Sequence, residues 1–175
     1  PRLRALDARR ADERQRLAHA IEMELPGPGQ WGRLAVACID NADEVCYALA
    51  TAAMSRAADG RGVVLIDLTE HGGLDSAVQE LMHGQDFERP TVLRPRGIPA
   101  LADNTADLRV VGYEDEEKDP PSPDLSDASL ILADLDPSVA ADHLAAWTER
   151  VIVVVTSGHS SVERVRTAGD LVRSA

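Results

Sequence analysis

The chain has 175 residues, of which 44% are hydrophobic and only 3% are aromatic, and its formal net charge is −12. This length suits one domain, and the composition requires a core of Val, Leu, Ile and Ala, as in buried parallel strands covered by Ala-rich helices. The negative charge, which no basic stripe offsets, argues against nucleic acid as a partner and against direct docking on anionic lipid.

The two cysteines, Cys38 and Cys46, lack metal-ligand spacing. We expect two reduced, partly buried thiols in a cytoplasmic protein, with a disulfide or redox switch as the alternative. No signal peptide and no apolar run of ~20 residues occurs, so no insertion of this chain into a membrane is expected. Because the chain begins at Pro1 without Met, we interpret it as a domain cut from a longer protein.

A polar amphipathic helix is predicted at the start of the chain, over residues 5–25. Its apolar residues recur at helical spacing among many Arg and Glu residues, at Leu17, Ile21 and Leu25. Proline and glycine alternate over residues 26–29 and end this helix. We therefore expect an N-terminal helix and linker at 1–30 and a single domain at 31–175.

The domain alternates apolar runs with helical patterns. The apolar runs predict strands at residues 34–39, 63–67, 91–93, 108–111, 130–134 and 151–155. The helical patterns lie between and after them, at residues 43–58, 74–83, around 137–147, and from Ser160 onward. Nearly all-apolar strands that alternate with helices predict a mostly parallel sheet with helices on both faces, which is a three-layer α/β/α fold.

Several residues are placed to begin or end these helices. Gly60 and Gly84 stand where the second and third helices should end. Ser160-x-x-Glu163 predicts a capping box for the last helix. The apolar face of that helix is expected to hold Val162, Val165, Ala168 and Val172.

Residues 113–127 are acidic and rich in proline. Such a composition buries too little apolar surface to fold, so it predicts a solvated loop. A docking segment for a basic partner is the alternative interpretation.

The order of motifs resembles that of a known fold. Val63-Val64-Leu65-Ile66-Asp67 is followed by the helix start Gly72-Gly73-Leu74, and later come Leu130-Ile131-Leu132-Ala133-Asp134-Leu135-Asp136-Pro137 and the run from Val151 to Ser161. This order resembles the deviant P-loop ATPases of the MinD/ParA type. It is more similar to the cytoplasmic domain of bacterial tyrosine autokinases that partner polysaccharide co-polymerases. The resemblance covers roughly residues 11–175 and implies a P-loop NTPase-like fold of the deviant Walker type.

That family carries a G-x-x-x-x-G-K-[ST] loop after its first strand. Counting back from Asp67 with the family's spacing puts the loop at Ile39-Asp40-Asn41-Ala42-Asp43-Glu44-Val45-Cys46. Ile39 and Glu44 replace the two glycines whose backbone would wrap the phosphates. Val45 replaces the phosphate-binding lysine, and Cys46 replaces the hydroxyl that holds Mg²⁺. We therefore expect a vestigial loop, no bound ATP and no cofactor.

Two acids of the family's motifs survive, Asp67 and Asp134. The second acid of the I-D-x-D motif is replaced by Thr69, and two carboxylates without phosphate oxygens make a poor Mg²⁺ site. We interpret both as vestigial Walker acids that accept hydrogen bonds from loop amides at the strand ends, and we predict no metal site.

The start of the second helix carries carboxylates where the family binds phosphate. We hypothesise that Asn41-x-x-Glu44 acts like a capping box and that Asp43 adds a negative charge in the first turn. These side chains would replace the phosphate with an internal anion. The alternative is an ordinary N-cap on a surface helix.

The resemblance implies a catalytically silent pseudo-enzyme that acts as a scaffold or regulator, through protein partners, in cell-envelope polysaccharide assembly. Self-association or a membrane co-polymerase would supply the partner. The domain would be cytoplasmic and tethered to the inner membrane through segments outside this chain. One alternative is a MinD/ParA-like positioning factor without ATP switching.

A second alternative is an enzyme that uses a crevice at the strand ends, near Asp67, Asp134 and His159. The hydroxyls and His159 between Thr156 and Ser161 follow a strand, and ligands bind at that edge in doubly wound sheets. The simpler explanation of these residues is that Ser160 caps the last helix.

Overall fold

The computed structural model describes residues 2–27, 32–61, 63–67, 73–83, 90–93, 128–134 and 149–174. The helices are α1 (Arg2–Glu24), α2 (Ala42–Ala58), α3 (Gly73–Leu81) and α5 (Val162–Ser174). The strands are β1 (Arg33–Cys38), β2 (Val63–Asp67), β3 (Thr91–Leu93), β4 (Ala128–Asp134) and β5 (Arg150–Val154). The predicted strand at 108–111, the helix around 137–147, Gly84 and the acidic segment 113–127 lie outside the described residues.

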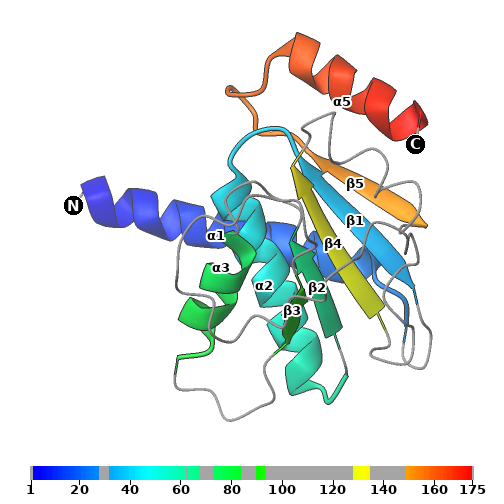
Figure 1. The fold of residues 1–175 in the computed structure, drawn as a ribbon. Helices are drawn as coiled ribbons and strands as arrows, with labels where there is room; N and C mark the ends of the chain where they lie inside the picture. Colours follow the sequence, from blue (N-terminus) through cyan, green and yellow to red (C-terminus); the bar gives the residue numbers. More distant parts are fainter. Residues whose placement is uncertain are drawn as a thin grey trace, which may run out of the picture.

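The five strands form one parallel sheet in the order β3-β2-β4-β1-β5 (Figure 1). This confirms the prediction of an α/β fold with a parallel sheet. β4 lies between β1 and β2. On one side, Asp134 of β4 pairs with Cys38 of β1, and on the other side, Leu132 of β4 pairs with Asp67 of β2. The carboxyl ends of β1, β2 and β4 therefore meet at one edge of the sheet.

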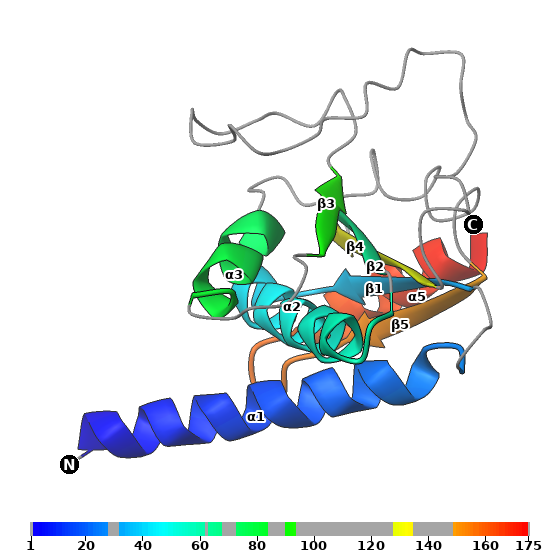
Figure 2. The ribbon, with the colours of Figure 1, turned by 90° about the horizontal axis from the view of Figure 1, so that it is seen from below.

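Helices α1 and α2 cover one face of the sheet, and α1 projects beyond the sheet at its N-terminal end (Figure 2). The helix expected around 137–147 falls outside the described residues. The parallel sheet and its helices establish the α/β class.

Small and aliphatic side chains build the core, as the composition predicts. On α2 the alanines Ala48, Ala50, Ala52 and Ala53 are completely buried, which allows α1 and the sheet to approach this helix closely. Ile21 and Leu25 of α1 are buried and Leu17 is half-buried, which confirms the predicted apolar face. Cys38 and Cys46 are buried in the same cluster, and neither forms a disulfide.

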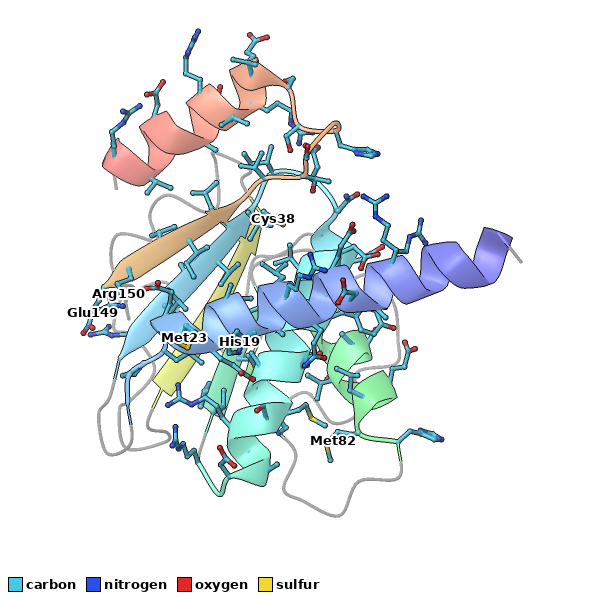
Figure 3. All side chains as sticks on the ribbon, turned by 180° about the vertical axis from the view of Figure 1, so that it is seen from behind. His19, Met23, Cys38, Met82, Glu149 and Arg150 are labelled. Carbon is cyan, nitrogen blue, oxygen red and sulfur yellow. The ribbon has the colours of Figure 1, made fainter. Side chains whose placement is uncertain are left out.

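The C-terminal end of α1 is fastened to β5. The Arg150 guanidinium donates to the Glu24 carboxylate at 3.1 Å and to the Glu24 carbonyl at 3.3 Å. Figure 3 shows Arg150 at this end of α1. Both partners are exposed, so this ion pair fixes the position of the helix end more than it adds stability.

Gly60 ends α2 as predicted. It adopts a φ of 74°, which only glycine adopts without steric cost, and its N–H donates to the Ala57 carbonyl at 2.9 Å. The Arg61 N–H then donates to the Arg56 carbonyl at 3.0 Å, so two carbonyls of the last turn are satisfied.

The predicted start of α5 is wrong by one residue. Ser161, not Ser160, is the cap, because its Oγ accepts from the Arg164 N–H at 3.2 Å. The Ser160 Oγ instead accepts from the Thr156 N–H at 3.1 Å and closes the turn before the helix. With this register Val162 lies in the first turn and is 76% exposed rather than on the apolar face, whereas Ala168 is buried.

No helix in the described part of the chain is both long enough and apolar enough to cross a membrane.

Candidate functional site

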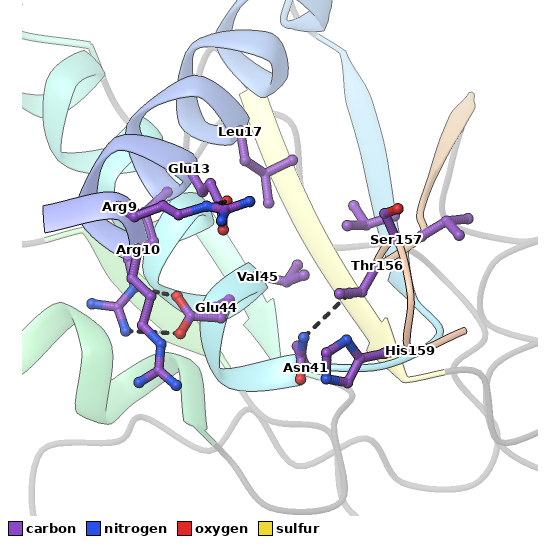
Figure 4. A pocket seen from close by; sticks show the side chains of 13 residues that line it. Arg9, Arg10, Glu13, Leu17, Asn41, Glu44, Val45, Thr156, Ser157 and His159 are labelled. Carbon is purple, nitrogen blue, oxygen red and sulfur yellow. Dashed lines mark hydrogen bonds and ion pairs between the residues drawn. The ribbon is translucent and has the colours of Figure 1, made fainter. Parts of the chain in front are cut away.

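A groove of ≈ 640 Å³ opens at the carboxyl ends of β1 and β5, where α1 passes the start of α2 (Figure 4). Helix α1 lines it with Arg9, Arg10, Glu13, Arg14 and Leu17. The start of α2 contributes Asn41, Glu44 and Val45, and the β5–α5 segment contributes Val154, Val155, Thr156, Ser157 and His159. Three parts of the chain that are distant in sequence thus form one groove with both charged and apolar lining residues.

The predicted vestigial loop, Ile39–Cys46, lies where β1 passes into α2. Only residues 39–41 connect the two elements, because α2 already begins at Ala42. Val45 and Cys46, at the positions of the lysine and the hydroxyl in the family motif, are buried within the helix. Neither side chain can therefore reach out to a phosphate.

Side chains from the C-terminal part of the domain hold this connection in place. Asp40 forms an ion pair with Arg164 of α5, and the Asp40 carbonyl accepts from the Thr156 hydroxyl at 3.5 Å. The Asn41 amide donates to the same hydroxyl at 3.3 Å. These hydrogen bonds and this ion pair therefore hold the β1–α2 connection against the segment after β5 and against α5.

The predicted capping role of Asn41 is wrong. Asn41 precedes α2 with φ 61° and ψ 50°, and its side chain makes no hydrogen bond to the first turn. A capping side chain normally needs a β-region backbone to reach the N–H groups of that turn. The left-handed backbone of Asn41 lets its amide pair with Thr156 instead. Asp43 and Glu44 do lie in the first turn, as expected.

Glu44 pairs with Arg14 of α1 and does not complete a capping box. The Arg14 Nε donates to one carboxylate oxygen, and its Nη2 donates to the other at 3.2 Å. The guanidinium also lies over the Tyr47 ring, 4.3 Å from its centre. The hydrogen bond to Glu44 raises the pKa of Arg14 and is the largest influence on that pKa. Burial acts in the opposite direction and lowers it.

Sequence reasoning did not find Arg14 or Tyr47 as site residues. Arg14 and Glu44 are 30 residues apart. Arg14 belongs to a helix with many other arginines, so no local spacing distinguishes it. Arg10 and Arg9 were missed for the same reason.

Asp67 has the structural role expected of it. The carboxylate is 2% exposed, and its Oδ2 accepts from the Leu74 N–H in the first turn of α3 at 3.2 Å. A carboxylate at a helix N-terminus is stabilised by the unpaired amides and the helix dipole. Asp134 ends β4, and in the sheet register its backbone lies beside Cys38.

The chain matches no protein-family model, no curated protein and no solved structure. The interpretation of the groove therefore depends on its own geometry.

The sequence also suggested a crevice that combines Asp67, Asp134 and His159. His159 lines the groove, whereas Asp67 is buried under α3 and is not among the lining residues. Within the described ranges, no group of three or more His, Cys, Asp or Glu side chains could hold a metal ion. The groove therefore offers arginine, amide and hydroxyl groups rather than a metal-ligand set.

The charges in the groove are unevenly paired. Arg9 pairs with Glu13 at 2.9 Å, but both are exposed, so the pair is weak. Arg14 is committed to Glu44. Arg10 makes no ion pair with any side chain that the structure describes, and it is exposed. The groove can thus supply hydrogen-bond donors to an anionic group.

Proposed function

We propose that this chain is a P-loop-like domain of the deviant Walker type that does not turn over nucleotide. It acts as a scaffold or regulator through protein partners. The observation that carries the proposal is the ion pair between Arg14 and Glu44 at the start of α2. By the resemblance, a working P-loop would bind the phosphate groups at this helix start, where this chain carries a carboxylate paired with its own arginine.

Electrostatics support the absence of nucleotide. Asp43 and Glu44 in the first turn of α2 repel a polyphosphate at the helix end that would otherwise attract it. The short connection at residues 39–41 has no glycine, and its left-handed residue is Asn41. Its contacts with Thr156 and Arg164 resist the rearrangement that wrapping a phosphate would need.

The wider role follows from the resemblance to polysaccharide-linked tyrosine autokinases. In this role the domain organises cell-envelope polysaccharide assembly, either by self-association or by contact with a membrane co-polymerase.

Isothermal titration of the chain with Mg-ATP, repeated with EDTA in place of Mg²⁺, tests the proposal. We expect no Mg²⁺-dependent binding and no Mg²⁺-dependent rise in melting temperature. Sedimentation of the chain should also give the same oligomeric state with and without Mg-ATP. Mg²⁺-dependent binding with a micromolar Kd would show that the site still works as a nucleotide site, and the proposal would then be wrong.

A further inference from the structure

We propose that the groove between α1 and the β5–α5 segment binds a small molecule through a phosphate or carboxylate group, with Glu44 as a built-in competitor for that group. The inference shares the Arg14–Glu44 pair with the proposed function but goes beyond it, because it concerns binding of an oxyanion by the arginines of α1 and not nucleotide turnover.

The first support is the distribution of charge. The whole chain carries a formal net charge of −12, yet α1 brings three arginines to this one groove. Thr156, Ser157 and His159 line the groove across from Arg10 and Glu44 (Figure 4). A ligand in the groove would thus meet guanidinium groups on one wall and hydroxyl and imidazole groups on the other.

The second support is the contact that the groove already makes. Arg14 holds the Glu44 carboxylate through two donors, Nε and Nη2. The planar fork of a guanidinium fits carboxylate and phosphate oxygens in the same way. The side chains of Arg14 and Glu44 are 34% and 32% exposed, so an anion from solution can reach this contact and compete with Glu44.

The third support is the size of the groove. Its volume of ≈ 640 Å³ lies within the range of roughly 300–1,000 Å³ that is usual for small-molecule sites. Leu17 and Val154, which are partly exposed, add apolar surface beside the arginines. The ligand class that fits is a small organic molecule with one multiply charged oxyanion group.

Inorganic pyrophosphate and citrate serve as probes for the phosphate and carboxylate forms of this chemistry. Each is titrated into the 175-residue chain in EDTA, at ionic strength matched with NaCl, by calorimetry and by the NMR signal of the Arg14 Nε–H. The variants are Glu44→Gln, which removes the competing charge, and Arg10→Ala, which removes a cation that has no ion pair among the described side chains. Arg166→Ala is the matched control, because Arg166 is exposed on α5 and does not line the groove.

We expect Glu44→Gln to bind at least one probe about tenfold more tightly than the natural sequence, because one nearby negative charge is gone. Arg10→Ala should weaken binding about three- to tenfold, while Arg166→Ala should leave it unchanged. The probe with the tighter binding identifies the group as phosphate or carboxylate. The Arg14 Nε–H signal should shift with the bound fraction.

The inference is overturned if neither probe binds Glu44→Gln, or if Arg166→Ala weakens binding as much as Arg10→Ala does. All four proteins must first give the same circular-dichroism spectrum. If Glu44→Gln does not fold, the comparison of Arg10→Ala with Arg166→Ala decides the outcome. Since the probes have no base and no Mg²⁺ is present, these results are separate from the Mg-ATP test of the proposed function.

Discussion

Arg14 of α1 and Glu44 of α2 form a two-donor ion pair, and the same guanidinium lies 4.3 Å from the centre of the Tyr47 ring. This contact joins the N-terminal helix to the start of α2 beside the groove. The buried face of α1, with Ile21 and Leu25, packs into the same core as α2. The position of α1, and with it one wall of the groove, therefore depends on both contacts.

Replacing Arg14 with alanine should lower the free energy of unfolding by about 1 kcal/mol. The half-exposed ion pair and the cation–π contact each contribute about 0.5–1 kcal/mol, and solvent screening keeps their sum small. Because the hydrogen bond to Glu44 raises the pKa of Arg14, this arginine stays charged and its contribution to stability is constant near neutral pH. Urea denaturation measures the loss.

Arg16→Ala is the control for that measurement. Arg16 also lies on α1 and pairs with Asp12, but it is 77% exposed, so its removal should change stability by no more than about 0.3 kcal/mol. Equal losses for Arg14→Ala and Arg16→Ala would mean that the contact with Glu44 and Tyr47 adds nothing.

Asp67→Ala should destabilise the chain by about 2 kcal/mol. The carboxylate is buried, and its loss leaves the Leu74 N–H without its acceptor at the start of α3. Asp67→Asn keeps a side-chain oxygen that can accept from the Leu74 N–H, so it should destabilise the chain by less. Thermal and urea denaturation measure the relative stability of these variants. The reference is Asp75→Ala, which changes a partly exposed residue in the first turn of the same helix. A fully stable Asp67→Ala would contradict the structural role of Asp67.

Gly60→Ala should cost about 1 kcal/mol through the backbone alone. Gly60 has a φ of +74°, and a Cβ placed there meets nothing within 4 Å, so no clash contributes. Gly60→Asn should recover much of the loss, because Asn tolerates the left-handed region better than Ala. Matching melting temperatures for the two variants would show that the turn adapts its backbone.

Local patterns predicted most of the described elements. The strand at 63–67 follows from an apolar run, and the end of α2 follows from Gly60. Both signals involve only residues that are neighbours in the sequence. The sheet order did not follow, because it depends on which strands pair across long connections. The left-handed backbone of Asn41 and the pairing of Arg14 with Glu44 also depend on tertiary contacts. The groove residues of the β5–α5 segment and of the start of α2 were therefore singled out from the sequence, whereas those of α1 were not.

Arg164→Ala should lower stability by about 1 kcal/mol, and Asp40→Asn in the same chain should restore part of it. The Asp40 side chain is only 17% exposed, its Oδ2 is buried without a hydrogen-bond partner, and Arg164 neutralises it from the surface. Without Arg164, the mostly buried carboxylate of Asp40 has no cation beside it. Burying such an unpaired carboxylate costs more stability than burying an amide of the same shape.

A double-mutant cycle of Asp40→Asn and Arg164→Ala measures this coupling by urea denaturation, with Arg166→Ala as a control for loss of charge on α5. The two changes should compensate each other, so that the double variant is more stable than Arg164→Ala alone. Additive losses would instead mean that Asp40 is stabilised by its surroundings without Arg164. In that case the ion pair would not be what ties the β1–α2 connection to α5.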